Sequence, residues 1–590
     1  MSVSKTTTCG ELSAADVGRS VTLMGWVNRR RDHGDLIFVD LRDRWGITQV
    51  VFDPEDSVAE WQHAREVRNE YVLAVTGDVA SRLPGKENPH LATGAIELRA
   101  RALEILNPAE TPPFVINEEV PVEEALRLRY RYLDLRRPRM TRNILLRHRV
   151  IKFMRDWLDA HDFIEIETPI LFKSTPGGAR DYLVPSRLHP GCFYALPQSP
   201  QQFKQLLMVA GVERYFQIAR CFRDEDQRGD RQPEFTQLDL EMSFVDRDDV
   251  LRLCEQLMSD LVPATSAKRI QEIPFPRLTY KDALARYGSD KPDLRFGLEL
   301  EDVGDLFAGT DFRLFAGALE SGGQIKALRA PGLAEVSRRE IDVLTETARR
   351  FGAKGLVTVG ITQDGVRSAI ARFITPQMRA ALLKRLDAVP GDLLLLVADE
   401  PAVVAEALGR LRLEIGARLN LADPNVMAFC WIIDVPLFER DEATGGFKAM
   451  HHQFTAPLDE DVSLLDSDPL AVRAKQYDLV CNGTELFGGS IRIHQRAVQE
   501  RIFHLLGMPQ EDIAAQFGHM LTAFEFGTPP HGGIAAGLDR IVMLLADEET
   551  IREVIPFPKN QSAQDVMGDA PAPVSPEQLA ELHIAVVPPS

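Results

Sequence analysis

The first hundred residues alternate apolar and polar positions in short runs. Five such runs follow one another, separated by turns rich in Asp and Gly, at residues 21–27, 36–41, 48–52, 71–78 and 95–105. A period of two over this length predicts β-strands. Together with a basic loop at residues 29–31, five strands fit an OB-type barrel that binds oligonucleotides, although any small barrel would show the same pattern. We expect this domain to occupy residues 1–108.

Prolines at 108, 112 and 113 then predict a linker, which we extend over residues 109–135. A helical stretch rich in arginine follows these prolines: Arg127, Arg129, Arg131, Arg136, Arg137, Arg139, Arg142, Arg147 and Arg149. Such a helix could face RNA phosphates, meet solvent or form a dimer interface. An amphipathic helix continues over residues 150–161, and a strand over residues 163–169 ends at Pro169.

The clearest β signal lies at residues 215–223 and 235–244. Leu238, Leu240 and Met242 fall on one face of the second strand, whereas Gln237, Asp239 and Glu241 fall on the other. Between the two strands lies a highly charged loop, residues 224–231. The pattern predicts an antiparallel hairpin whose charged face is a candidate active-site floor. The alternative is that this polar face simply meets solvent.

Residues 288–424 change character, to mixed helices and strands with few aromatic side chains. Strongly patterned segments resume after them, at residues 431–438, 450–454, 477–494 and 531–547. We therefore interpret residues 288–424 as an inserted α/β domain. It divides a second domain into two parts, residues 136–287 and residues 425–590.

Composition narrows the class of protein. The chain has 590 residues and a formal net charge of −19, which argues against non-specific coating of nucleic acid but allows local basic patches. Its six cysteines lie far apart without a Cys-x-x-Cys pair, as suits a reducing cytosol. There is no apolar signal segment at the start, and the most apolar run, residues 393–398, is too short to span a bilayer. We expect a large cytoplasmic enzyme without a membrane partner.

Three segments resemble the motifs of class II aminoacyl-tRNA synthetases. Residues 222–226 (Phe-Arg-Asp-Glu-Asp) with residues 231–239 resemble motif 2, Gly-Leu-Asp-Arg at 537–540 resembles motif 3, and the helix and strand ending at Pro169 resemble the dimer-forming motif 1. Residues 198–204, 288–294 and 488–494 resemble the bacterial-type aspartyl enzymes of the aspartyl/asparaginyl/lysyl subclass. The resemblance covers essentially the whole chain. It implies an α+β fold, with an OB-type barrel, an antiparallel-sheet catalytic domain and the insertion.

The resemblance also assigns residues to ATP. Arg223 and Arg540 are the implied catalytic residues. Arg223 would bind the α-phosphate and the substrate carboxylate, and Arg540 the γ-phosphate, because positioned cations neutralise the charge that develops there. The matching positions for ATP are Arg223, Asp224, Glu225, Gln232, Glu485, Gly537, Leu538, Asp539 and Arg540. Asp478 and Glu485 match an acidic pair that binds Mg²⁺, an ion that prefers hard oxygen ligands.

For the amino acid, the resemblance implies a cationic pocket. Arg492 offers a bidentate fork and Lys204 a point charge to a side-chain carboxylate. The positions that match aspartate contacts are Gly177, Gln201, Lys204, Arg223, Asp239, His451, His452 and Arg492. Three residues depart from the family pattern: Gly177 stands where a glutamate contacts the substrate ammonium, Gln453 where proline is usual, and Phe487 where glycine is usual.

On the barrel, Arg31, Phe38, Gln49 and Glu97 match anticodon-binding positions. His33 and Gly85 resemble the residues of relaxed members of the family, which charge both tRNA-Asp and tRNA-Asn and so supply a partner amidotransferase. The resemblance further implies a homodimer. Two alternatives remain open: a lysyl- or asparaginyl-specific enzyme, which the cations Arg492 and Lys204 disfavour in the case of lysine, and a paralogue that binds RNA or a small molecule without charging tRNA.

Overall fold

The computed structural model describes residues 4–174 and 179–587, which form two compact units. One contains residues up to 145 together with residues 555–572, and the other contains residues 146–554 and the chain from 573 onward. Among the described residues, no helix has the length and apolar character needed to cross a membrane.

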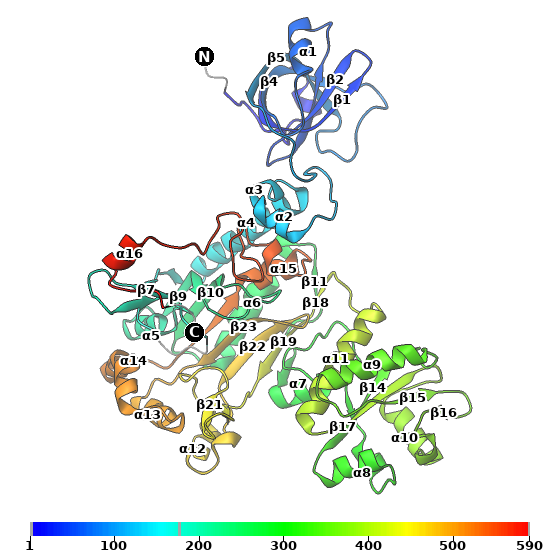
Figure 1. The fold of residues 1–590 in the computed structure, drawn as a ribbon, viewed down its shortest axis with the longest axis vertical. Helices are drawn as coiled ribbons and strands as arrows, with labels where there is room; N and C mark the ends of the chain where they lie inside the picture. The colour runs from blue at the N-terminus through cyan, green and yellow to red at the C-terminus, as the bar shows by residue number, and fades with distance from the viewer. Residues whose placement is uncertain (1–3, 175–178, 588–590) are drawn as a thin grey trace. The chain divides into compact units, whose positions relative to one another are not determined.

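The first unit contains a closed five-stranded barrel, in which the strands follow the order β1-β2-β3-β5-β4 (Figure 1). Its elements are β1 (Ser20–His33), β2 (Leu36–Arg42), β3 (Ile47–Phe52), α1 (Val58–Ala64), β4 (Val72–Ser81) and β5 (Ile96–Asn107). The apolar positions of the period-two pattern point inward, and Leu23, Val39, Val50, Leu73 and Leu98 are fully buried. The predicted barrel and the interpretation of its pattern are confirmed.

The arginine-rich stretch forms α2 (Glu124–Arg129), α3 (Arg131–Asp134) and α4 (Pro138–Asp159). Arg127, Arg131 and Arg137 are buried around Asp134, and the Arg131 guanidinium lies 2.6 Å from its carboxylate. The prediction that these arginines face RNA, solvent or a dimer partner is therefore wrong for these three. A carboxylate within the stretch binds them internally, since buried charges require partners.

The second unit is built on an eight-stranded sheet of order β12-β19-β22-β23-β24-β10-β9-β6. Its strands are β12 (Arg277–Thr279), β19 (Phe429–Ile433), β22 (Gln476–Cys481), β23 (Thr484–Ile491), β24 (His531–Gly537), β10 (Glu234–Ser243), β9 (Arg214–Phe222) and β6 (Ile164–Glu165). The six central strands pair antiparallel, and only the edge strands β12 and β6 pair parallel. The predicted hairpin is present as β9 and β10, and the predicted fold class is confirmed.

Helices cover the apolar face of this sheet, with α6 against β24 and α15 against β10, β23 and β24. The helices of this domain are α5 (Gln201–Val209), α6 (Arg247–Thr265), α7 (Tyr280–Tyr287), α13 (Arg496–Leu505), α14 (Gln510–Ala523) and α15 (Leu538–Leu545). Smaller elements are β7 (Leu183–Pro185), β8 (Phe193–Ala195), β11 (Arg269–Ile270), β18 (Val426–Met427), β20 (Phe438–Arg440), β21 (Phe447–Ala449), α12 (Leu464–Ser467) and α16 (Pro576–Glu581).

The segment interpreted as an insertion forms its own five-stranded antiparallel sheet, of order β13-β14-β17-β15-β16. It comprises β13 (Glu301–Asp302), α8 (Arg313–Glu320), β14 (Gln324–Ala330), α9 (Arg338–Arg350), β15 (Val357–Ile361), β16 (Val366–Arg367), α10 (Pro376–Arg385), β17 (Leu393–Asp399) and α11 (Pro401–Arg418). All seven residues of β17 are buried, because apolar cores lie on both faces of the sheet. Helices α9 and α11 cover one of them (Figure 1).

Candidate active site

A pocket of about 380 Å³ opens on the polar face of the eight-stranded sheet. Its volume is typical of small-molecule sites. Most of the predicted site residues line it together: Gln201, Lys204, Arg223, Glu225, Gln232, Asp239, His451, His452, Glu485, Arg492, Gly537, Asp539 and Arg540. The charged face of the β9–β10 hairpin is therefore a pocket floor, and the alternative that it meets solvent is wrong.

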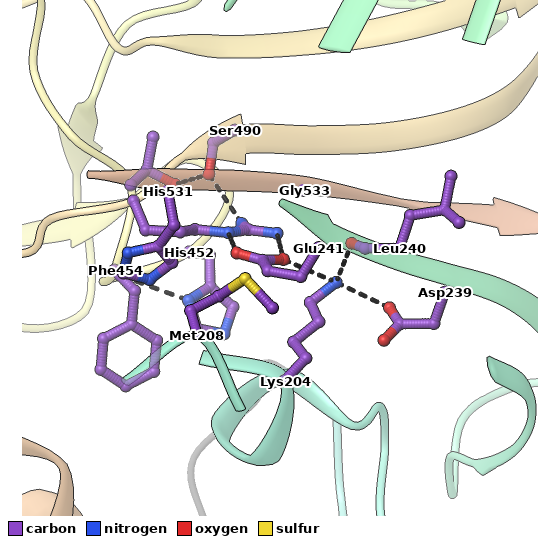
Figure 2. Close-up of polar contacts among 12 residues, drawn as sticks. Lys204, Met208, Asp239, Leu240, Glu241, His452, Phe454, Ser490, His531 and Gly533 are labelled. Carbon is purple, nitrogen blue, oxygen red and sulfur yellow. Dashed lines mark hydrogen bonds and ion pairs between the residues drawn. The ribbon is translucent and has the colours of Figure 1, made fainter. Parts of the chain in front are cut away.

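One end of the pocket holds four interlocked, fully buried charges. The Lys204 ammonium, on α5, lies 2.7 Å from Asp239 Oδ1 and 3.3 Å from Glu241 Oε2, and it points between the two carboxylates in Figure 2. Arg492 donates from Nε and a terminal nitrogen to Glu241, at 3.1 and 3.3 Å, and from the other terminal nitrogen to Ser490 Oγ at 2.7 Å. None of the four charged side chains is more than 2% exposed. We call Lys204, Asp239, Glu241 and Arg492 the ion cluster.

Glu241 is the member of the ion cluster that sequence reasoning left out of the site. It lies opposite Gly533 on the neighbouring strand β24, and a Cβ at Gly533 would lie 1.8 Å from Glu241 Oε2. Only glycine therefore leaves room for this carboxylate. Burial disfavours the charged form of Glu241, but Arg492 and Lys204 outweigh it and lower the pKa of this carboxyl below its ordinary value. In the sequence, Glu241 could have been found from the glycines that face a strand with alternating acidic residues.

Three buried polar atoms in or beside the ion cluster are available to bind a ligand. Asp239 Oδ2, Gln201 Nε2 and Arg223 Nε are buried without a hydrogen-bond partner among the described residues. Buried polar groups are nearly always hydrogen-bonded in folded proteins. All three residues line the pocket, so the arrangement suits a small ligand that carries both acceptors and a donor.

The two predicted histidines lie next to each other at the same end of the pocket as the ion cluster, with ring centroids 6.5 Å apart. His452 Nδ1 accepts from the backbone N–H of Phe454 at 3.3 Å. His451 lines the pocket. Desolvation there and the nearby Arg492 lower its pKa to about 4. Both rings are therefore neutral near pH 7.

The predicted acidic pair comes together on the hairpin of β22 and β23. A Cβ at Gly488 would lie 3.2 Å from Asp478 Oδ1 and 3.4 Å from Glu485 Oε1, so glycine keeps the space between the two carboxylates open. Asp478 Oδ1 is buried without a partner among the described residues. Burial and the nearby Glu485 raise the pKa of Asp478 well above its ordinary value. Two adjacent carboxylates with an orphaned oxygen suit Mg²⁺, which is bound by one or two carboxylates plus substrate phosphates. Among the described residues, no group of three or more His, Cys, Asp or Glu side chains is arranged to hold a metal alone.

The opposite end of the pocket carries cations paired with acids from loops and strand ends. Arg540 donates to the backbone carbonyl of Glu485 at 2.9 Å and to Asp230 at 3.0 Å, and Arg231 pairs with Glu225. Arg223 follows β9, and its guanidinium lies 5.0 Å from the Phe235 ring centre. In the Arg540–Asp230 and Arg231–Glu225 pairs, each side chain is one-quarter to one-half exposed, unlike those of the ion cluster.

Three residues assigned to ATP lie differently from the rest. Asp539 accepts from Arg147 at 2.5 Å and from the Thr236 backbone at 3.0 Å, so its carboxylate ties α15 to the neighbouring elements at the pocket wall. Leu538 is fully buried in α15 and does not line the pocket. Asp224 also lies outside the lining, where its backbone N–H donates to Arg180. Gly177 lies outside the described residues.

The other two departures from the family pattern have defined places. The Gln453 carbonyl accepts from the buried Gln499 side chain at 2.8 Å. Phe487 is fully buried on β23, opposite Leu479 and Ala536 on the neighbouring strands. Neither residue lines the pocket.

On the barrel, the four predicted anticodon positions share one face. Arg31 donates to Gln49 Oε1 at 3.4 Å and Gln49 donates to Glu97 at 3.0 Å, while Phe38 lies opposite Arg31 in the β1–β2 register. Asp40, which sequence reasoning missed, accepts from Arg31 at 2.9 Å in the same network. His33 ends β1 as an exposed residue, and Gly85 lies in the turn closed by Lys86 and Leu83. A polar network with one aromatic ring suits base recognition.

Comparison with known proteins decides the family. Residues 123–561 match the model of the class II tRNA synthetases of the D, K and N type, and residues 21–106 match the OB-fold nucleic acid binding domain. This chain belongs to the class II aminoacyl-tRNA synthetases. It is an enzyme of the ligase type, built on an antiparallel catalytic sheet and an OB-fold domain.

Similar proteins span nearly the whole synthetase. The chain is 58% identical over 582 residues to a Rubrobacter xylanophilus protein and 60% identical over 576 residues to a Moorella thermoacetica protein, each named aspartate–tRNA(Asp/Asn) ligase. These matches cover 99% and 98% of this chain and 97% and 96% of the two relatives. Among solved structures, asparaginyl-tRNA synthetase from Pyrococcus horikoshii, complexed with asparaginyl-adenylate, has a TM-score of 0.59 at 19% identity and covers 94% of this chain and 98% of its own. That likeness supports the fold alone.

Proposed function

We propose that this synthetase is an aspartate–tRNA ligase that activates L-aspartate with ATP and esterifies both tRNA-Asp and tRNA-Asn. The observation that carries the amino-acid assignment is the geometry of Arg492. Its three contacts use three of the five N–H donors of an arginine, which leaves one on each terminal nitrogen for a ligand carboxylate. Because Glu241 holds the other edge of the guanidinium, the remaining fork is pre-oriented at the pocket.

The charges select against the related amino acids. A lysine side chain would bring a third cation beside Lys204 and Arg492. An asparagine carboxamide has one acceptor oxygen where a carboxylate has two, so it would leave one charged donor of the free Arg492 fork unpaired, and loss of a partner from a buried charged group costs on the order of 3–5 kcal/mol. That difference corresponds to roughly a hundredfold to a few thousandfold in selectivity.

Activation joins an aspartate carboxylate oxygen to the α-phosphorus of ATP and releases pyrophosphate. Arg223 neutralises the charge that develops on the α-phosphate, and Arg540 binds the terminal phosphate. The unpartnered Asp239 Oδ2 accepts from the substrate ammonium. Asp478 and Glu485 would hold Mg²⁺, which supplies charge neutralisation on the phosphates when bound.

The barrel and the names of the two relatives support charging of both tRNAs. Aspartate and asparagine anticodons differ only at the third base, C against U. The exposed His33 can donate or accept a hydrogen bond and so tolerates either pyrimidine. Aspartyl-tRNA-Asn would then be amidated by a partner amidotransferase. All six cysteines are unpaired, which suits our placement of this chemistry in the reducing cytoplasm.

We further propose a homodimer through the sheet edge at β6. This edge strand and the segment after it expose Ile164, Ile170 and Leu171. Exposed apolar side chains beside an open strand edge favour association. Sedimentation at micromolar concentration should give the dimer mass, and Leu171→Glu should shift it to the monomer. A fully active monomer of the unaltered protein would contradict the proposal.

ATP–pyrophosphate exchange tests the amino-acid assignment. Exchange should depend on aspartate and be at least about a hundredfold weaker with asparagine or lysine. Exchange with asparagine or lysine instead would identify the corresponding specificity, and no exchange at all would indicate the non-charging paralogue.

Charging assays then test the tRNA range. Efficiency with purified tRNA-Asn should lie within about a hundredfold of that with tRNA-Asp, a gap of roughly 2.7 kcal/mol. A larger gap would restrict the enzyme to tRNA-Asp. His33→Leu should widen the gap while leaving aspartate-dependent exchange unchanged, since His33 lies on the barrel and not in the pocket.

A further inference from the structure

Lys291 is a cation of the pocket to which neither the resemblance nor the function proposed above assigns a role. Its ammonium lies 2.9 Å from Glu485 Oε2, and its side chain is 43% exposed. It lines the same pocket as Arg540, whose guanidinium binds the backbone carbonyl of the same Glu485. Two cations from distant parts of the sequence thus converge on one residue of the acidic pair.

The Lys291 ammonium lies beside the acidic pair that suits a divalent ion, on Oε2 of Glu485. Asp478 and Glu485 are adjacent carboxylates with Asp478 Oδ1 buried and unpartnered among the described residues, and Lys291 supplies one positive charge to them. A divalent ion bound to both carboxylates would compete with this ammonium for Glu485. Lysine carries its charge on a flexible four-carbon stem, so it can change partners without moving its backbone.

The loop that carries Lys291 is firmly anchored. Arg412 on α11 is 1% exposed and donates to the carbonyls of Asp293, Phe296 and Gly297 at 2.8 Å each, just after Lys291. On the other side of Lys291, Gly288 packs against Gly409 of the same helix, so closely that a Cβ on Gly288 would lie 2.8 Å from Gly409 Cα. A fixed backbone restricts the ammonium to a small region, in which it reaches either the acidic pair or a ligand beside it.

We propose, on the basis of the function proposed above, that Lys291 is a phosphate-binding residue that pairs with Glu485 until the nucleotide arrives. In the nucleotide-free enzyme its ammonium pairs with Glu485. With ATP bound, Lys291 would leave Glu485 for the terminal phosphates and the departing pyrophosphate, and Glu485 would be free to hold Mg²⁺ together with Asp478. The inserted domain, through Arg412, fixes the loop from which this lysine reaches.

Two binding measurements with opposite expected signs test the exchange of partners. Lys291→Met removes the charge and keeps an unbranched side chain of similar length. Without nucleotide, this variant should bind Mn²⁺ about threefold or more tightly, because the competing ammonium is gone. The paramagnetic resonance signal of free Mn²⁺ measures this binding. The same variant should weaken binding of inorganic pyrophosphate with Mg²⁺, measured by calorimetry, about tenfold, or about 1.4 kcal/mol. Lys291→Arg should restore pyrophosphate binding.

Lys354→Met is the matched control, because Lys354 is an exposed lysine that pairs with Asp399 in the inserted domain and does not line the pocket. It should change neither measurement. Mn²⁺ binding that is unchanged or weaker in Lys291→Met would overturn the proposal, as would unchanged pyrophosphate binding. Aspartate-dependent exchange by the unaltered enzyme, in the same preparation, separates a failure of this inference from a failure of the proposed function.

Discussion

The two ends of the pocket bind charge in different ways. At the amino-acid end, the ion cluster is fully buried and its members pair with one another. Each of these residues lies on a helix or strand or directly next to one. At the phosphate end, Arg231, Lys291 and Arg540 are one-quarter to one-half exposed, and each is paired with a single acid.

The difference matches what each end must do. Selecting one carboxylate requires cations whose positions do not adjust, because adjustment would let a neutral side chain fit. Binding and releasing phosphates requires cations that change partners, since pyrophosphate must leave in every cycle. We infer that burial sets selectivity at one end and that partial exposure allows turnover at the other.

The largest effect is expected from Arg492→Leu. It removes the fork that reads the side-chain carboxylate and leaves Glu241 with Lys204 as its remaining cation. Aspartate-dependent exchange should fall by about a thousandfold or more, in line with a loss on the order of 3–5 kcal/mol for a broken buried pair. ATP-analogue affinity, measured by calorimetry on protein shown to be folded by circular dichroism, should stay within about threefold. Exchange within about tenfold of the unaltered enzyme would make the assignment wrong.

Much of this architecture is readable from local pattern. The period-two runs predict the barrel and the β9–β10 hairpin, and the alternation at Leu238, Asp239 and Leu240 predicts which face is polar. Pairing across distant segments is not readable in this way. The alternation places Glu241 on the polar face, but only the β10–β24 register sets it opposite Gly533 and beside Arg492. The arginines around Asp134 were missed for a different reason: Arg131 and Arg137 lie only three residues from it, but their burial depends on tertiary contacts, such as those of Arg131 with the carbonyls of residues 555 and 556.

Glu241→Gln tests whether the ion cluster is pre-organised. Glutamine keeps the shape but removes the charge that orients both Lys204 and Arg492. We expect stability to fall by on the order of 3 kcal/mol and aspartate kcat/KM to fall about a hundredfold. Thermal unfolding and exchange kinetics measure the two effects. Full stability together with unaltered aspartate kcat/KM would show that the cations hold their positions without Glu241.

Arg540→Met probes the phosphate end. Loss of the implied terminal-phosphate contact should raise the KM for ATP about tenfold to a hundredfold, while the KM for aspartate stays within about threefold. Exchange kinetics with each substrate varied in turn separate the two constants. A comparable rise in both would mean that the ends of the pocket are coupled and not distinct.

Asp230→Asn removes the acid that pairs with Arg540 at the phosphate end. If Asp230 competes with ATP for this guanidinium, the KM for ATP should fall about twofold to threefold, since a partly exposed pair is worth little. A rise in the KM for ATP would instead indicate that Asp230 positions Arg540 for the nucleotide.

The smallest effect concerns the histidine pair at the amino-acid end. Desolvation in the pocket and the nearby Arg492 lower the pKa of His451 to about 4 from an unfolded value near 6.5, so the unfolded chain binds this proton first as pH falls. His451 should therefore contribute to a loss of stability between pH 6.5 and about 4, and none of this loss should appear above pH 6.5. The fall in thermal midpoint between pH 7.5 and pH 5.0 should be smaller in His451→Gln. An equal fall in both proteins would show that His451 titrates normally.

A crystal structure with L-aspartate, Mg²⁺ and an ATP analogue that has a methylene group between the α- and β-phosphorus tests the contrast between the two ends most directly. We predict that Lys204–Asp239 and Arg492–Glu241 persist at 2.7 and 3.1 Å, while Lys291 leaves Glu485 and Arg540 leaves Asp230 for the phosphates. Rearrangement of the ion cluster around aspartate, with the phosphate-end pairs intact, would contradict the account.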